Sequence, residues 1–296
     1  MFKQQIIGTI NLSLPTIILF QVYPNFIFSW FGITVISLAT GLYIFFVNWQ
    51  SSWKMVNSFL YKPTGDYAEK LEKMITECNM RSEAITINYA YAHETISMAT
   101  FNNMVIDPIV WSIVEYDPEA LKVKDIYEKA IEPQLSSLQK TRLQLIKQAL
   151  TPGAQRFIFK HELAHIYYHY SYKRLILAGF IGACASAIAL YAAQEMFNLF
   201  NGIAAIITGI LMGMTVDLFL TYTSNILFKA QQEKKADLFA ARYSTREDIQ
   251  AAADFFEKHQ AIIETNKDPN NKLSFLPSII ATGHPDGKTR ARYLSV

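Results

Sequence analysis

The stretch HELAH, which spans residues 161–165, has residue types and a spacing that suit metal chemistry. Residues four apart share one face of an α-helix, so His161 and His165 can direct two imidazoles at one ion, with Glu162 beside them. Zinc suits two imidazoles and one carboxylate, and it leaves a fourth position for a water whose pKa falls towards neutrality. The stretch therefore predicts a zinc site at which Glu162 takes a proton from water and later delivers it to a leaving amine.

A solvated surface helix is the plain alternative for a pair of histidines at this spacing. The full motif is expected by chance in on the order of one in a hundred sequences of this composition. Four apolar side chains, however, would bury the helix beside its site: Phe157, Ile158, Leu163 and Ile166. We therefore favour the metal site over the solvated helix.

A third metal ligand has to come from elsewhere in the chain, because the residues after His165 lack the glycine and histidine of the metzincin continuation. Beyond a long apolar segment the chain reads QQEKKADLFAARY, which places Glu233 and Asp237 four apart on one helical face. Glu233 is the candidate ligand, and Asp237 is a candidate acceptor for the ring N–H of a histidine ligand. Alone, two such acids would indicate a solvated helix face, but HELAH makes the metal interpretation the better one.

Helices are expected to position both halves of this site. Thr151-Pro152-Gly153 predicts the start of the HELAH helix, since a hydroxyl residue caps it and proline suits its first turn, and we expect the helix to continue toward Lys173. Between polar helical segments, residues 84–108 alternate at period two, which predicts a small sheet whose edge could pair with an extended peptide. Other segments with helical spacing are residues 66–80, 117–150 with a break at Glu132-Pro133, 230–243 and 245–266.

The composition indicates a membrane protein. Hydrophobic residues make up 51% of the chain, charged residues only 18%, and the mean hydropathy is +0.13. Four apolar segments, paired as two helix hairpins, are candidate membrane spans: Ile6–Gln21, Phe26–Val47, Leu175–Gln194 and Asn198–Phe228. We therefore expect a multi-pass membrane protein in the lipid bilayer, mainly α-helical with a small β-sheet.

The polar segments around these hairpins predict a split catalytic domain. Residues 1–51 are expected to form the N-terminal transmembrane hairpin and residues 173–228 the second one. Residues 52–172, with HELAH, and residues 229–296, with Glu233, then form the two parts of a zincin-like domain.

The distribution of charge predicts the orientation of the chain and excludes one class of partner. Lysines and arginines flank the spans on one side, whereas both hairpin loops lack them, so we expect the catalytic domain on the cytoplasmic side. The formal net charge is only +2 and no Lys/Arg-rich block occurs, so nucleic acid is not an expected partner. The two cysteines form no CxxC pair, so a disulfide framework is not expected.

The order of these parts resembles a known group of enzymes. HELAH, two apolar segments, EKKAD leading into LFAARY, and finally GHPDGKTRARYL resemble the HtpX-type and CAAX prenyl endopeptidase membrane gluzincins over nearly the whole chain. The resemblance implies zinc held by His161, His165 and Glu233, catalysis by Glu162 and support from Asp237.

The resemblance also implies roles for His284 and Arg290, the histidine of the HP pair and the arginine that follows it. In such enzymes these residues approach the active site and steady the oxyanion or the substrate backbone. The alternative is a terminal His-Pro turn followed by a solvated arginine.

The expected function is that of a membrane-bound zinc endopeptidase with one Zn²⁺ per chain. Its expected substrates are membrane-associated or misfolded polypeptides, because the HELAH helix precedes an apolar segment directly. Two alternatives stay open at this point: a non-catalytic membrane adaptor with a structural zinc site, and a prenyl-protein endopeptidase of the CAAX type.

Overall fold

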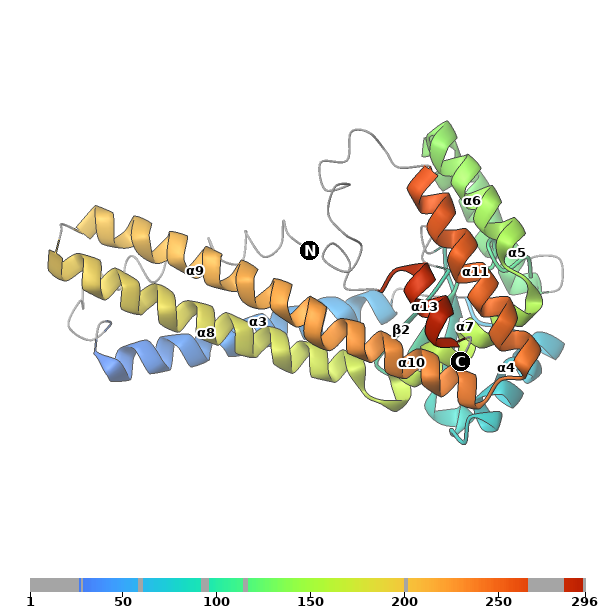
Figure 1. The fold of residues 1–296 in the computed structure, drawn as a ribbon, viewed down its shortest axis with the longest axis horizontal. Coiled ribbons are helices and arrows are strands. Elements are labelled where there is room, and N and C mark those ends of the chain that lie inside the picture. The colour runs from blue at the N-terminus through green and yellow to red at the C-terminus, as the bar shows by residue number, and fades with distance from the viewer. Residues whose placement is uncertain are drawn as a thin grey trace. The chain divides into compact units, whose positions relative to one another are not determined.

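The computed structural model describes residues 27, 29–57, 61–91, 96–113, 117–199, 202–265 and 285–294. Within these residues the protein is mainly helical and contains a three-stranded sheet (Figure 1), which confirms the predicted fold class. The chain separates into two compact units. Residues 1–53 and 172–224 form the first unit, and residues 54–171 and 225–296 form the second.

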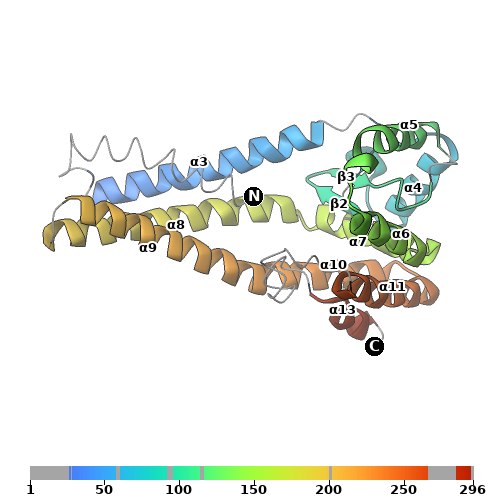
Figure 2. The ribbon, with the colours of Figure 1, turned by 90° about the horizontal axis from the view of Figure 1, so that it is seen from above.

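Three long helices make up the described part of the first unit: α3 (Trp30–Asn57), α8 (Tyr170–Leu199) and α9 (Gly202–Ser224). They lie side by side in both ribbon views (Figures 1 and 2). Three segments of the described residues are long and apolar enough to cross a membrane, namely Trp30–Met55, Tyr170–Leu199 and Ile207–Arg242. They indicate an integral membrane protein. The predicted span Ile6–Gln21 lies outside the described residues.

Small residues let these three helices approach closely. A Cβ atom at Gly41 of α3 would lie 2.6 Å from the carbonyl oxygen of Gly179 in α8, so a larger residue would force the two backbones apart. Large apolar side chains lie on the outside instead, and Phe180 and Phe219 are 64% and 65% exposed. Such a surface suits contact with lipid.

The sheet of the second unit has the strand order β1–β3–β2. The strands are β1 (Thr86–Tyr89), β2 (Ser97–Thr100) and β3 (Asn103–Ile106). The central strand β3 runs parallel to β1 and antiparallel to β2. The sheet predicted within residues 84–108 is thus confirmed, and β2 is one of its two edge strands.

Helices and short helical turns make up most of the remaining second unit. The turn η3 contains Glu132 and Pro133, so the helical segment predicted for residues 117–150 breaks where the proline requires it. These elements are α4 (Gly65–Glu77), η1 (Ser82–Ala84), α5 (Pro118–Ile126), η2 (Tyr127–Ile131), η3 (Glu132–Gln134), α6 (Ser137–Ala149), α7 (Pro152–Tyr167), η4 (Asn225–Lys229), α10 (Ala230–Arg242), α11 (Arg246–Thr265) and α13 (Gly287–Leu294).

The helix that carries HELAH, α7, lies between the sheet and the pair α10 and α11 (Figure 2). It begins as predicted, because the Thr151 hydroxyl accepts the N–H of Ala154 and Pro152 occupies the first turn. Phe157, Phe159 and Leu163 are fully buried. Packing on several sides therefore fixes where the histidines of α7 lie.

The end of α7 differs from the prediction that the helix continues toward Lys173. His169 has a φ of 54°, in the left-handed region, and the N–H groups of Tyr168 and His169 bond to the carbonyl oxygens of Ala164 and Ile166. A left-handed residue of this kind closes a helix, and histidine adopts the conformation more readily than most residues. The chain therefore starts a new helix, α8, at Tyr170.

Candidate metal centre

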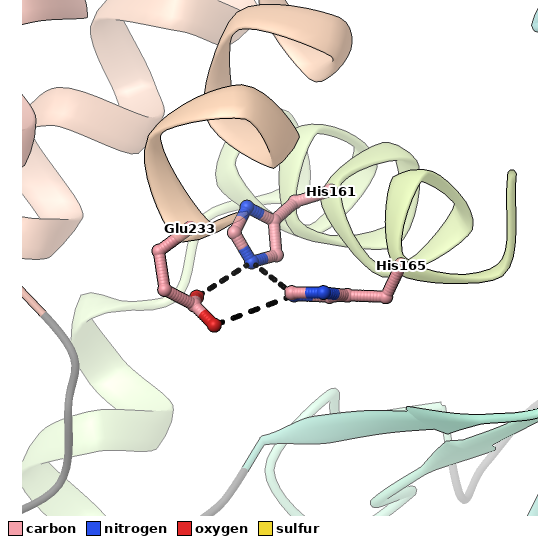
Figure 3. A group of neighbouring side chains, drawn as sticks. All are labelled: His161, His165 and Glu233. Atoms are coloured by element: carbon pink, nitrogen blue, oxygen red, sulfur yellow. Dashed lines mark hydrogen bonds and ion pairs between the residues drawn. The ribbon is translucent and has the colours of Figure 1, made fainter. Parts of the chain in front are cut away.

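Two histidines of α7 and one glutamate of α10 converge on one point (Figure 3). Nε2 of His161 lies 3.1 Å from Nε2 of His165 and 3.4 Å from Oε2 of Glu233. Nε2 of His165 lies 3.7 Å from Oε1 of Glu233. All three side chains are buried. The structure thus brings the three predicted ligands together, although α8 and α9 separate them in the sequence.

These spacings fit a zinc ion. Zinc binds imidazole nitrogen and carboxylate oxygen at about 2.0–2.2 Å in a tetrahedral arrangement, so two ligand atoms of one ion lie roughly 3.3–3.6 Å apart. The distances of 3.1, 3.4 and 3.7 Å bracket that range. Three electron-rich atoms so close together in a buried place are a donor set that a divalent cation stabilises.

Asp237 fixes the orientation of His161 by contacting the ring nitrogen that faces away from the other two ligands. It lies one turn after Glu233 on α10, and its Oδ1 lies 2.7 Å from Nδ1 of His161. When the Nδ1 proton is held by this carboxylate, the lone pair of Nε2 points toward the other two ligands. The geometry is the one expected for a carboxylate that supports a metal-binding histidine.

Two side chains of α13 hold Asp237 in turn. Arg290 donates to both carboxylate oxygens, from Nε at 2.9 Å and from Nη2 at 2.6 Å, and the Tyr293 hydroxyl donates to Oδ2 at 2.8 Å. The Arg290 side chain is only 14% exposed, so the alternative of a solvated arginine is wrong. Its contact with an oxyanion stays a prediction. His284 lies outside the described residues, and its role also stays a prediction.

The comparison with known families agrees with this geometry. A profile of peptidase family M48 matches residues 142–296, which is more than half of the chain. The chain belongs to peptidase family M48. Membership implies a zinc cofactor and polypeptide substrates, and it confirms the resemblance to HtpX-type membrane zinc metallopeptidases. No curated protein and no solved structure matched the sequence.

In this M48 peptidase the predicted general base, Glu162, follows His161 on α7 and is half-buried. The hydroxyl of Ser97 in β2 donates a hydrogen bond to Oε1 of Glu162, with 3.3 Å between the two oxygens. Nothing in the sequence points to Ser97 as a residue of the site. A serine in a strand gives no signal for a contact with a helix 65 residues away.

Burial and neighbouring charges shift the pKa values of the acidic groups at the M48 site. Burial raises the pKa of the Glu162 carboxyl above its usual range, although the His161 imidazole opposes this. Burial would also raise the pKa of Asp237, but the charges of Arg290 and His161 outweigh it and hold that pKa well below its usual range. Asp237 is therefore ionised, which is the form that accepts hydrogen bonds from Arg290, Tyr293 and His161.

The Asp237 carboxylate also shifts the pKa of His161. Burial lowers the pKa of the His161 imidazole, but the adjacent Asp237 carboxylate more than compensates, and the pKa lies above its usual range. Zinc binding requires the neutral imidazole, so a zinc ion that binds here would displace a proton from His161.

A buried cation on α7 helps to hold the glutamate helix in place. Lys160 is 4% exposed, and its Nζ donates to the carbonyl oxygen of Tyr243, at the end of α10, at 2.5 Å. Nζ also lies 3.5 Å from Oε2 of Glu77 in α4. Lys160 therefore links α7 to the carboxyl end of the helix that carries Glu233.

Proposed function

We propose that this M48 peptidase is a membrane-bound zinc endopeptidase that hydrolyses peptide bonds with Glu162 as general base. The observation that carries the proposal is the convergence of His161, His165 and Glu233, whose ligand atoms all lie within 4.8 Å of one another beside Glu162. One zinc ion per chain would use these three ligands.

Each side chain has a distinct task in this reaction. When bound, zinc activates water as a nucleophile and polarises the scissile carbonyl. Glu162 accepts the proton of the attacking water and returns it to the leaving amine as the C–N bond breaks. Asp237 keeps His161 in the orientation and tautomer that present Nε2 to the metal.

The substrate class follows from the membrane-spanning helices. An enzyme with three candidate membrane spans encounters membrane-associated or misfolded membrane polypeptides more readily than soluble proteins. The flanking lysines and arginines support a cytoplasmic catalytic side. Edge strand β2, which contacts Glu162 through Ser97, is a place where an extended substrate could add a strand.

Zinc quantification combined with cleavage of denatured casein tests the proposal on the full chain in detergent. The wild type should contain zinc and cleave, and Glu162→Gln should keep most of the zinc but lose cleavage by about 10²–10⁴-fold. Glu233→Ala should lose both zinc and cleavage, since it removes a ligand. Glu257→Gln, on the exposed face of α11, is the matched control and should resemble the wild type.

Two outcomes would favour a different function. Zinc without wild-type cleavage would favour a membrane adaptor with a structural zinc site. Cleavage of a farnesylated CAAX peptide, with no cleavage of the same peptide lacking the prenyl group, would favour a prenyl-protein endopeptidase. Equal zinc content in the wild type, Glu162→Gln and Glu233→Ala would overturn the assignment of the ligands.

A further inference from the structure

Ser97 is a buried hydroxyl that contacts the general base. It is 4% exposed, and its hydroxyl donates to Oε1 of Glu162. Backbone pairing with Ile106 of β3 holds Ser97 on one side, and β2 packs against α7. The match to the family begins at residue 142, so β2 lies outside the matched region and the comparison assigns Ser97 no role.

The backbone before Ser97 is strained. Ile96 has a φ of 46°, and the left-handed region is unfavourable for a β-branched residue. Ile96 is nevertheless buried, and its carbonyl oxygen accepts the N–H of Asp107 at 3.2 Å. Strained residues of this kind persist where the surrounding structure holds them, often at functional sites. The strain is adjacent to the residue whose side chain reaches Glu162.

We propose that Ser97 is a positioning residue for Glu162: its hydroxyl holds Oε1 and leaves Oε2 to accept the proton of the attacking water. The last torsion of a glutamate side chain has only broad preferences, so the carboxylate can turn unless one oxygen is held. A general base must stay within hydrogen-bond reach of the proton that it removes. This inference rests on the proposed function of Glu162.

Ser97 undergoes no chemical change during hydrolysis. Oε2 takes one proton from water as the water oxygen forms a bond to the scissile carbonyl carbon. The same proton passes to the amine nitrogen as the C–N bond breaks. Ser97 keeps its own proton throughout, because it serves only as the hydrogen-bond donor to Oε1.

Steady-state cleavage of a fluorogenic peptide by the full chain in detergent tests the role. Ser97→Ala should lower kcat about tenfold, a loss typical for one hydrogen bond to a charged group, while KM and zinc content stay unchanged. Ser97→Thr keeps a hydroxyl and should recover most of the activity. Ser97→Cys has a weaker donor of similar shape and should fall between serine and alanine. If Ser97→Thr does not fold, Ser97→Cys takes its place as the variant that keeps a donor.

The matched control is Thr86→Ala, which removes a hydroxyl from β1 at the other edge of the same sheet and should keep the wild-type kcat. An unchanged kcat in Ser97→Ala would overturn the proposal. Equal losses of kcat in Ser97→Ala and in Ser97→Thr, or in the Ser97→Cys variant that stands in for it, would also overturn the proposal. The hydrogen-bond donor at position 97 would then make no difference to the rate.

A double-mutant cycle tests the contact without turnover. The apparent Tm of the zinc-free protein is measured for Ser97→Ala, Glu162→Ala and the double variant. If the two side chains interact, Ser97→Ala should change the Tm less when Glu162 is already absent. Additive changes in Tm would contradict the contact.

The proposed function and the role of Ser97 fail in different ways. If the wild type does not hydrolyse peptide, the proposed function is overturned, and the role of Ser97 in it is overturned as well. If the wild type hydrolyses peptide and depends on Glu162 but not on Ser97, only the role of Ser97 is overturned.

Discussion

Asp237 accepts hydrogen bonds from side chains of two other helices, and this makes it the link between the C-terminal helix and the metal ligands. His161 of α7 approaches one side of the carboxylate, and Arg290 and Tyr293 of α13 approach the other. The carboxylate is fully buried, so its charge is not screened by water. Loss of Asp237 should therefore weaken zinc binding, and loss of its partners in α13 should lower stability.

Zinc affinity should depend on Asp237 although it does not bind the metal. Asp237→Ala should weaken zinc binding about 10–100-fold, because a metal-binding histidine loses its orienting partner. Competition with a chromophoric chelator measures the affinity. Asp125→Ala, at an exposed position of α5, is the control and should bind zinc like the wild type. Unchanged affinity in Asp237→Ala would refute the supporting role.

Arg290 and Tyr293 should contribute unequally to stability. Arg290→Ala leaves a buried carboxylate without its principal cation and should lower the free energy of unfolding by about 3–5 kcal/mol. Tyr293→Phe removes one hydrogen bond to the same carboxylate and should cost about 1 kcal/mol. Thermal unfolding of the full chain in detergent compares the two variants. Equal effects would show that the ion pair with Asp237 is not the main contact of Arg290.

Residues of the site could be predicted from the sequence where their spacing is local. HELAH places His161 and His165 on one helical face, and the spacing of Glu233 and Asp237 does the same on α10. Ser97 and Tyr293 could not be predicted, because their contacts with Glu162 and Asp237 join distant segments and leave no periodic pattern.

At the scale of helices, α11 contains a histidine that should make stability depend on pH. His259 is stacked on Phe255, and burial, together with the charges of Arg290 and Arg142, lowers its pKa from 6.5 to about 4. Below pH 6.5 the unfolded chain therefore binds a proton that the folded chain does not, so stability falls as the pH falls from 6.5 to 4.

His259→Gln should remove this part of the acid sensitivity. The stabilisation of the variant relative to the wild type should grow below pH 6.5 and reach on the order of 2 kcal/mol at pH 5. The difference in apparent Tm between the two proteins, measured from pH 7.5 to pH 4.5, checks this. A difference that stays constant with pH would contradict the lowered pKa of His259.

Helix beginnings were easier to predict than the end of α7. Thr151 and Pro152 start α7 as expected, and Thr245 caps α11 by accepting the N–H of Asp248, because capping depends on residues a few positions apart. The turn at His169 could not be predicted, because no glycine marks the position that adopts the left-handed conformation.

At the scale of the whole molecule, the apolar helices predict how the protein is held in its membrane. Three candidate spans among the described residues should keep it in the bilayer during an alkaline carbonate wash, and only detergent should release it. Immunoblotting of the washed membranes and the supernatant measures the distribution. Release by carbonate alone would contradict integral insertion.

Composition and apolar segments were enough to predict a helical membrane protein, since membrane helices need about 20 apolar residues. The strand order β1–β3–β2 could not be predicted in the same way, because it depends on contacts between segments that are far apart in the sequence. The meeting of α7 with α10 could be predicted from the metal ligands but not from composition.

X-ray absorption at the zinc edge of the purified full chain tests the metal site most directly. The account predicts scattering from two imidazoles, with only nitrogen and oxygen ligands at about 2.0–2.2 Å. In Glu233→Ala the bound zinc should fall sharply in amount. A sulfur ligand at about 2.3 Å, or scattering from fewer than two imidazoles, would contradict a centre built from His161, His165 and Glu233.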